Sequence, residues 1–254
     1  MRRWRGALLL LLLPACGGAA ALLGAGCRGR HETAAVTPLP APPDAAARVR
    51  MVDSQIAARG VRNPRVLAAM REVPRHLFVP TLVASQAYGS GALPIGAKQT
   101  ISQPYIVARM IELLDLTGKE KVLEIGTGTG YQTVVLSKLC AKVFSIERIN
   151  ELALRAAEMI RTLKIHNASV KVFDGTYGWS DQAPFDRIIV AAAAPEVPEP
   201  LMQQLSRTGK LVIPIGPEGN QRLARVMRVG TRMQVEDCGT AEFVPLVGKF
   251  GWKE

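Results

Sequence analysis

A glycine-rich turn between an apolar strand and a helix is the feature that most constrains what this chain can fold into. Residues 122–131 read VLEIGTGTGY, and a helical pattern continues from Tyr131 to Leu139. The three glycines of this turn remove the side chains that would keep a ligand away from the backbone. The free N–H groups of the turn and of the helix N-terminus then face the ligand. The segment therefore predicts a nucleotide-type cofactor site at the end of a parallel sheet.

The spacing of the glycines narrows the class of cofactor. A dinucleotide fingerprint, G-x-G-x-x-G, requires glycine at the position that Tyr131 occupies. Here the run is G-x-G-x-G, preceded by Glu124, and Glu147 ends the next apolar strand, where a carboxylate can accept both ribose hydroxyls of an adenosine. This combination resembles the S-adenosylmethionine site of Rossmann-like methyltransferases. The alternative is a glycine-rich turn that binds no ligand.

Helical and strand patterns alternate along the rest of the chain. Helices are expected at 63–73, within 100–114, and at 131–139, 150–163 and 200–205. Buried strands are expected at 122–125, 142–147, 169–173, 185–191 and 210–214, and antiparallel strands at 222–229, 232–236 and 242–247. This order predicts an α/β fold of Rossmann-like, doubly wound type, as in class I methyltransferases, with a mostly parallel sheet and an antiparallel C-terminal part.

Composition argues for one globular domain and against nucleic-acid binding. A length of 254 residues with 48% hydrophobic residues suits one α/β domain plus a tail. The net charge is +11, but the first fifty residues hold seven arginines and two acids, a surplus of five that leaves about +6 for the remainder. Only 5% of residues are aromatic, and no basic helix stands out. We therefore expect no nucleic acid among the partners.

The N-terminus has the pattern of a secretory signal. Three arginines within the first five residues precede an apolar run from Ala7 to Leu13 that continues through small residues to Ala25. We expect a signal peptide of lipoprotein type at 1–27, a Pro/Ala-rich linker at 28–50 and the methyltransferase domain at 51–254. Cys27 is the expected lipid attachment site and Cys16 the alternative, which would tether the protein to a membrane in the cell envelope. The competing interpretation is a cytoplasmic protein that starts at Met51.

The remaining cysteines and the histidines predict no metal site. Cys140 and Cys238 lie far apart in the sequence, and no Cys-x-x-Cys is present. The three histidines are scattered along the chain. None of these residues has the spacing of a metal-ligand set.

From about Met51 to its end, the chain resembles the protein-L-isoaspartate O-methyltransferase family. The most specific segment is 93–104, LPIGAKQTISQP, which is similar to the family's loop before the glycine motif. Segments 73–80 (VPRHLFVP), 174–179 (DGTYGW), 184–186 (PFD) and 243–246 (FVPL) also match, in the family's order. Two departures stand out: the glycine-containing stretch from Tyr88 to Ala92, and Lys98 in place of the usual glycine.

The resemblance implies a role for each site residue. Ser102 would be the active-site hydroxyl that holds the substrate carboxylate, the alternative being that it only caps the following helix. Asp174 would face the adenine amino group of the cofactor, the alternative being a turn aspartate. The implied substrate-binding residues are Val244, Pro245 and Leu246. The implied cofactor-binding residues are Thr100, Ile101, Gly126, Thr127, Gly128, Thr129, Gly130, Glu147, Arg148, Asp174 and Gly175.

The implied activity is methyl transfer from S-adenosyl-L-methionine to the free α-carboxylate of L-isoaspartyl residues in damaged proteins and peptides. The ester would close to a succinimide, whose opening regenerates some normal aspartate. We expect a monomer and no bound metal. Two alternatives remain from the sequence: a different S-adenosylmethionine enzyme acting on a small molecule, and a non-catalytic envelope lipoprotein that keeps the fold.

Overall fold

The computed structural model describes residues 45–253, so the predicted signal peptide, with Cys16 and Cys27, and most of the predicted linker lie outside the described residues. The helical segments are α1 (Ala45–Met51), η1 (Val52–Ile56), η2 (Ala57–Arg59), α2 (Pro64–Glu72), η3 (Arg75–Phe78), η4 (Thr81–Gln86), α3 (Pro104–Leu113), α4 (Tyr131–Ser137), α5 (Asn150–Thr162), η5 (Gly175–Tyr177), η6 (Ser180–Gln182) and α6 (Glu199–Gln203). The strands are β1 (Leu93–Gly96), β2 (Gln99–Ile101), β3 (Lys121–Ile125), β4 (Lys142–Glu147), β5 (Ala168–Val172), β6 (Phe185–Val190), β7 (Leu205–Ile215), β8 (Gln221–Val229) and β9 (Arg232–Ala241).

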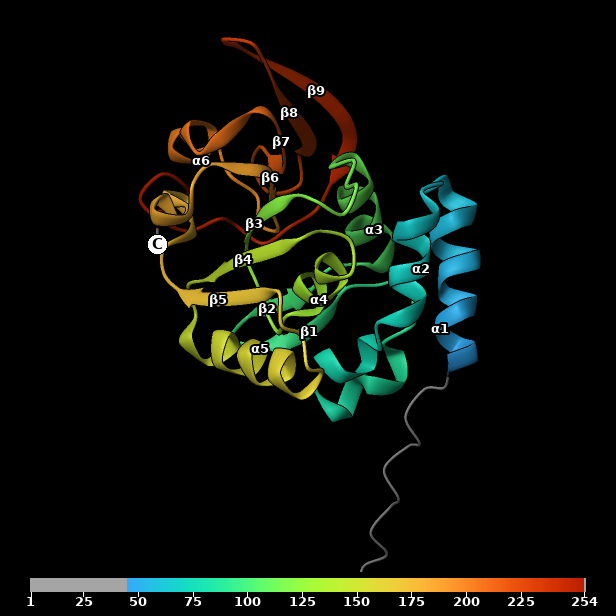
Figure 1. Ribbon diagram of the computed structural model, residues 1–254. Helices are drawn as coiled ribbons and strands as arrows, with labels where there is room; N and C mark the ends of the chain where they lie inside the picture. Colours follow the sequence, from blue (N-terminus) through green and yellow to red (C-terminus); the bar gives the residue numbers. More distant parts are fainter. Residues whose placement is uncertain (1–44, 254) are drawn as a thin grey trace, which may run out of the picture. The chain divides into compact units, whose positions relative to one another are not determined.

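A seven-stranded sheet organises the fold. Its order is β5-β4-β3-β6-β7-β8-β9, and a separate hairpin pairs β1 with β2 (Figure 1). The strands from β5 to β7 run parallel, whereas β8 and β9 are antiparallel to their neighbours. The parallel part of the sheet begins with β3 and continues outward through β4 and β5. The chain then returns to form β6 on the other side of β3. The predicted fold class is confirmed, and β3 and β6 flank the point where the winding reverses, which is where such sheets bind ligands.

Alternation of side chains along the strands divides the core into two layers. Val122 and Val143 belong to a cluster that includes the buried faces of α2 to α5, whereas Leu123 and Phe144, the next residues along, belong to a cluster with Leu201 of α6. Because successive side chains of a strand point to opposite faces, both faces of the parallel strands are covered. The rigid layer between them fixes the strand ends on which the candidate site is built.

Helix α2 begins where the sequence predicts, after Asn63. The Asn63 side chain accepts hydrogen bonds from the backbone N–H groups of Arg65 and Val66, and Pro64 occupies the first turn. This arrangement satisfies donors that no preceding turn can satisfy.

Two predicted boundaries are wrong. Helix α1 begins at Ala45, so residues 45–50 belong to the folded domain and not to the linker; Met51 is buried, and Arg48 donates a hydrogen bond to the carbonyl of Arg71. Residues 242–247 are not a strand of the sheet, because the Gln221 side chain bonds both the N–H and the carbonyl of Phe243. The segment instead crosses the end of β6, where Ala193 pairs with its backbone.

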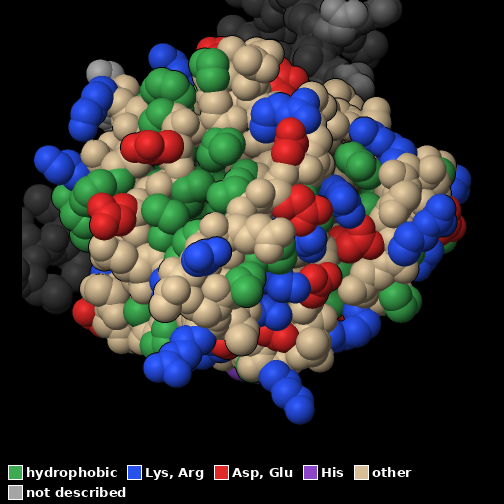
Figure 2. All heavy atoms as spheres, turned by 90° about the horizontal axis from the view of Figure 1, so that it is seen from above, with side chains coloured by type: hydrophobic (Ala, Val, Ile, Leu, Met, Phe, Trp, Pro, Cys, Tyr) green, Lys and Arg blue, Asp and Glu red, His purple; other side chains and the backbone are tan. Residues whose placement is uncertain are grey.

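The surface of the described part shows mixed charge. Figure 2 shows Lys and Arg side chains interspersed with Asp and Glu on the face that is visible there, with hydrophobic side chains between them. None of the helices within residues 45–253 combines the length and the apolar character that a bilayer span requires.

Candidate active site

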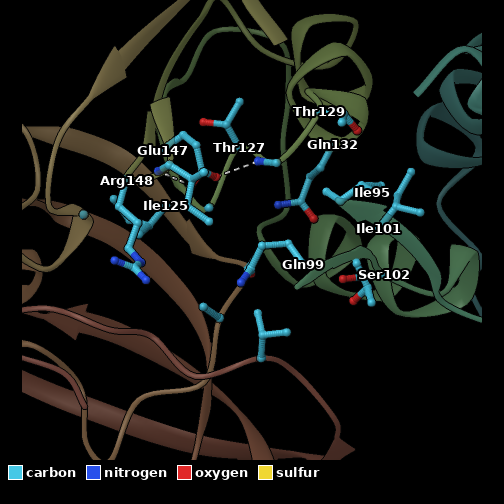
Figure 3. A pocket seen from close by; sticks show the side chains of 18 of the residues that line it. Ile95, Gln99, Ile101, Ser102, Ile125, Thr127, Thr129, Gln132, Glu147 and Arg148 are labelled. Atoms are coloured by element: carbon cyan, nitrogen blue, oxygen red, sulfur yellow. Dashed lines mark hydrogen bonds between the residues drawn. The ribbon is translucent and has the colours of Figure 1, made fainter. Parts of the chain in front are cut away.

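A cavity of about 380 Å³ lies at the carboxyl ends of the parallel strands (Figure 3). Most of the site residues expected from the sequence line it. They are Thr100, Ile101, Ser102, Gly126, Thr127, Gly128, Thr129, Glu147, Arg148, Gly175, Val244, Pro245 and Leu246. The β1–β2 hairpin, the glycine turn, the end of β4 and the 244–247 segment thus meet around one pocket, whose volume lies in the range of small-ligand sites.

The glycine turn has the backbone that only glycine adopts easily. Gly126 and Gly128 have φ angles of 90° and 55°. A Cβ on Gly126 would lie 3.4 Å from the Cβ of Ala191 at the end of β6, and one on Gly128 would lie 3.2 Å from Cδ1 of Ile95. These two glycines therefore let the turn approach both the cavity and its walls.

Gly130 has a different role from the one expected, because it does not line the cavity. It precedes α4 with a φ angle of 93°, and a Cβ there would lie 3.2 Å from the Cβ of Ala156 on α5. Its lack of a side chain allows the start of α4 to pack closely against α5, so it shapes the pocket without forming its surface.

Glu147 is tied to the glycine turn. Its Oε2 accepts a hydrogen bond of 2.8 Å from the N–H of Gly128, and its Oε1 accepts one of 2.9 Å from the N–H of Ile149 (Figure 3). The side chain is buried to 6% exposure but lines the cavity. Each carboxylate oxygen has more than one acceptor site, so Glu147 can still receive hydroxyl donors from a ligand.

The two threonines of the turn contribute backbone and not hydroxyl groups to the cavity. The Thr127 hydroxyl shares a hydrogen bond of 2.6 Å with the Ser145 hydroxyl, and the Thr129 hydroxyl donates to the carbonyl of Phe78. Both hydroxyls thus anchor the turn to neighbouring elements.

Glu124 is a buried carboxylate beneath the turn. Its side chain is fully buried on the α4 face of β3, and its Oε2 accepts from the hydroxyls of Thr133 and Ser145. Burial raises the pKa of Glu124 to about 7, against the lowering effect of the hydrogen bonds from Ser145 and Thr133. Its Oε1, and the Nε2 of Gln132 at the cavity wall, have no hydrogen-bond partner among residues 45–253.

Ser102 lies where two cavities meet. It lines the 380 Å³ cavity and also a second, neighbouring cavity of about 920 Å³. The residue before Pro104, at the start of α3, is Gln103, and no side chain caps that helix end. The hydroxyl of Ser102 therefore has no capping bond, and the alternative that it only caps the helix is wrong.

Arg75 holds the backbone of Ser102 from below. Its guanidinium is fully buried and donates to the carbonyls of Ser102, at 2.7 Å, and Ala87, at 2.9 Å. Its Cζ lies 4.9 Å from the ring centroid of Tyr131. Burial lowers the pKa of Arg75, with Tyr131 and Tyr88 acting against it. The buried side chain of Arg75 thus connects segment 73–80 to Ala87 and to Ser102.

Asp174 is not placed as expected. Its Oδ1 accepts from the N–H and the hydroxyl of Thr176, and its Oδ2 accepts from the N–H of Lys249. Asp174 does not line the 380 Å³ cavity, although Gly175 does. The carboxylate caps η5 and binds the C-terminal segment, and Asp174 lines a neighbouring cavity together with Arg148 and Val247; its role towards adenine stays a prediction.

The match to known proteins covers nearly all of the described chain. The family model described as protein-L-isoaspartate(D-aspartate) O-methyltransferase matches residues 46–251. The chain belongs to this family. Relatives named protein-L-isoaspartate O-methyltransferase from Syntrophus aciditrophicus and Trichlorobacter lovleyi are each 52% identical over 208 residues, which cover 81% and 82% of this chain and 95% and 96% of theirs.

Solved structures with the same description share the fold. One, titled protein-L-isoaspartate O-methyltransferase, aligns with a TM-score of 0.72 at 26% identity over 82% of this chain and 67% of its own. Another, a putative protein-L-isoaspartate O-methyltransferase from Plasmodium falciparum in complex with S-adenosyl-L-homocysteine, aligns with a TM-score of 0.67 at 24% identity over 78% of this chain and 96% of its own.

Several pocket residues were not expected from the sequence. Ala191 and Ala192 follow β6, and Ile149 follows β4, so the rule that ligands bind beyond the carboxyl ends of parallel strands could have found them. Ile95 and Gln99 come from the β1–β2 hairpin, and only the folded chain brings them to the glycine turn.

Lys98, where the family usually has glycine, lines the same cavity. Its φ angle is 56° and that of Ala97 is 50°, which is the left-handed region. The hairpin therefore keeps a conformation that suits glycine while carrying an added cation. Among residues 45–253, no group of three or more His, Cys, Asp or Glu side chains could hold a metal ion.

Proposed function

We infer that this protein transfers a methyl group from S-adenosyl-L-methionine to the free α-carboxylate of L-isoaspartyl residues in damaged proteins and peptides. The observation that carries this function is the position of Ser102, at the junction of a cofactor-sized pocket and a larger cavity, in a chain of the protein-L-isoaspartate O-methyltransferase family.

The pocket fits this cofactor. Gly126 and Gly128 bring backbone against the cavity, and Glu147 stands at the end of the strand where a ribose would lie. When bound, this cofactor supplies an activated methyl group.

The chain itself aligns the two reactants. The substrate carboxylate is already ionised near neutral pH, so its oxygen can attack the methyl carbon without a general base. Ser102, held through its carbonyl by Arg75, can donate a hydrogen bond to that carboxylate and orient it. The buried Leu246 and the partly buried Val244 line the pocket, and Val244 also lines the larger cavity beside Ser102. Rate acceleration then comes from holding two reactants in line.

The product explains the repair. Methylation turns the carboxylate into an ester with a good leaving group. The neighbouring backbone nitrogen attacks the ester carbonyl, methanol leaves, and a succinimide forms. Hydrolysis of the succinimide gives a mixture of normal and isoaspartyl links, so repeated cycles accumulate normal aspartate.

The test is methyl transfer to paired peptides that differ only in an aspartyl or isoaspartyl link. We expect methylation of the isoaspartyl peptide alone. Ser102→Ala should lower kcat by one to two orders of magnitude and leave cofactor affinity unchanged, because its proposed partner is the substrate. Equal rates on both peptides would refute the substrate, and loss of cofactor binding in Ser102→Ala would make Ser102 structural.

We also propose that the protein is a monomer that is exported and tethered to a membrane by a lipid on Cys27. The support is the order of arginines and apolar residues before position 25 and the change to polar residues after Cys27. A start at Met51 would remove most of α1, including the contact of Arg48 with the carbonyl of Arg71. Cys27→Ser should abolish lipid labelling and Cys16→Ser should preserve it; a native N-terminus at Met51 would refute export.

A further inference from the structure

We propose that Arg59 makes this enzyme favour isoaspartyl sites that have an acidic residue one or two positions away. The proposal rests on the proposed function and names a substrate preference within it. The larger cavity, of about 920 Å³, joins the cofactor pocket at Thr100, Ser102, Ala191, Val244 and Pro245, so a peptide whose isoaspartyl group reaches Ser102 lies in it.

Arg59 is the cation among the residues that line this cavity. The other charged lining residues are Glu218 and Glu242. Arg59 is the last residue of η2 and precedes Gly60, whose φ angle of 101° turns the chain away. The side chains of Glu218 and Glu242 make no ion pair with residues 45–253, so neither of them neutralises Arg59.

Tyr105 holds the guanidinium in place. The Cζ of Arg59 lies 3.6 Å from the centroid of the Tyr105 ring, a close cation–π contact. Stacking occupies one face of the guanidinium and leaves its N–H edge open. Within residues 45–253 that edge has no hydrogen-bond or ion-pair partner. A planar, immobilised guanidinium with a free edge is suited to bind a carboxylate through two parallel hydrogen bonds.

Ser102 and the ring that contacts Arg59 are close neighbours in the chain. Tyr105 is three residues after Ser102 and belongs to the first turn of α3. One or two residues of an extended peptide span roughly 3–7 Å. Ser102 and Arg59 line the same cavity, so an acidic side chain next to the isoaspartyl residue, or one position further, can face Arg59 while the reacting carboxylate stays at Ser102. Glu218 and Glu242 disfavour a second anion beside them.

The test uses isoaspartyl peptides that are identical except for Glu, Gln or Lys placed one position before or after the isoaspartyl residue. We expect kcat/KM to be about three- to fivefold higher for Glu than for Gln on one of the two sides, which is the upper range for an exposed charge pair such as one with Arg59. Lys should be the poorest there, and added salt should reduce the preference. Arg59→Gln should abolish it.

Arg62→Gln is the matched control. Arg62 is an exposed arginine three residues away that does not line the cavity, so its removal changes net charge equally and should leave the preference intact. An unchanged preference in Arg59→Gln, or an equal loss for all peptides, would overturn the proposal; the second result would assign Arg59 to the carboxylate that every substrate shares. Failure of the proposed function would look different, since no isoaspartyl peptide would then be favoured over its aspartyl counterpart.

Discussion

Replacing Glu124 by Gln should stabilise the fold at alkaline pH, and the size of the gain can be worked from the structure. Burial raises the pKa of Glu124 from 4.5 to about 7. Well below pH 4.5 the carboxyl is protonated in both the folded and the unfolded chain, and it does not lower the free energy of unfolding. As the pH rises through this window, the unfolded chain ionises freely while the folded chain resists. The wild-type protein therefore loses stability between pH 4.5 and 7, and the loss is complete above pH 7.

The magnitude follows from about 1.36 kcal/mol for each pKa unit of difference. In the wild type, Glu124 should lower the free energy of unfolding by about 3 kcal/mol at pH 8 and by less than ~1 kcal/mol at pH 5. Gln is nearly isosteric and neutral, and the hydroxyls of Thr133 and Ser145 can serve an amide by reorienting. Glu124→Gln should thus gain ~2 kcal/mol relative to the wild type between pH 5 and pH 8.

Denaturant unfolding of both proteins at pH 5 and pH 8, without cofactor, measures this difference. Glu120→Gln is the matched control. Burial alone would raise the pKa of Glu120, but hydrogen bonds from Thr117 and from the backbone of Glu120 and Gly118 outweigh it and hold the pKa at about 2. That stability is lost only as the pH falls from 4.5 towards 2, so the Glu120→Gln difference should stay constant between pH 5 and 8. A Glu124→Gln difference that also stays constant would refute the reasoning.

Four further substitutions separate binding from folding. Glu147→Ala should weaken cofactor binding by about 1.5–3 kcal/mol, because charge-assisted hydrogen bonds are lost, and calorimetry showing equal affinity would remove Glu147 from the site. Gly130→Ala should cost roughly 1–2 kcal/mol of stability, because of its left-handed backbone, with little change in cofactor affinity; Gly128→Ala, on the cavity surface, should reduce affinity in the same titration. Asp174→Ala should lower the free energy of unfolding by about 1–3 kcal/mol, through the acceptors it provides to Thr176 and Lys249, and an effect confined to cofactor affinity would return it to the adenine site.

The core of the site could be predicted from sequence because it depends on short segments. The glycine turn after β3 and the acid that ends β4 are each specified within about ten residues, by backbone freedom and by strand periodicity. Adjacent parallel strands then place Glu147 beside the turn without further information. Ser102, Thr100 and the 244–246 segment were reached through the family resemblance, and the structure places them at the same pocket.

The misplaced residues fail for a common reason: a local pattern does not fix which partner a group finds. Asp174 follows a strand as expected, but Thr176 and Lys249 bind its carboxylate, and it lines a neighbouring cavity instead of the pocket at the glycine turn. Residues 242–247 have strand-like composition, but the side chain of Gln221 takes the backbone groups of Phe243. Both competitors come from parts of the chain that the local segment does not contain.

The sequence by itself determined the parallel strands and the helices between them, the glycine turn and the type of cofactor site, since these follow from dihedral preferences and periodicity within one segment. Only the tertiary structure decided that Gly130 packs on Ala156, that Arg75 supports Ser102, and that Arg59 rests on Tyr105 from 46 residues away. These contacts join segments distant in the chain. The packing of helices and loops around the sheet sets the geometry of these contacts. It brings Arg59 against the ring of Tyr105 and into the wall of the larger cavity.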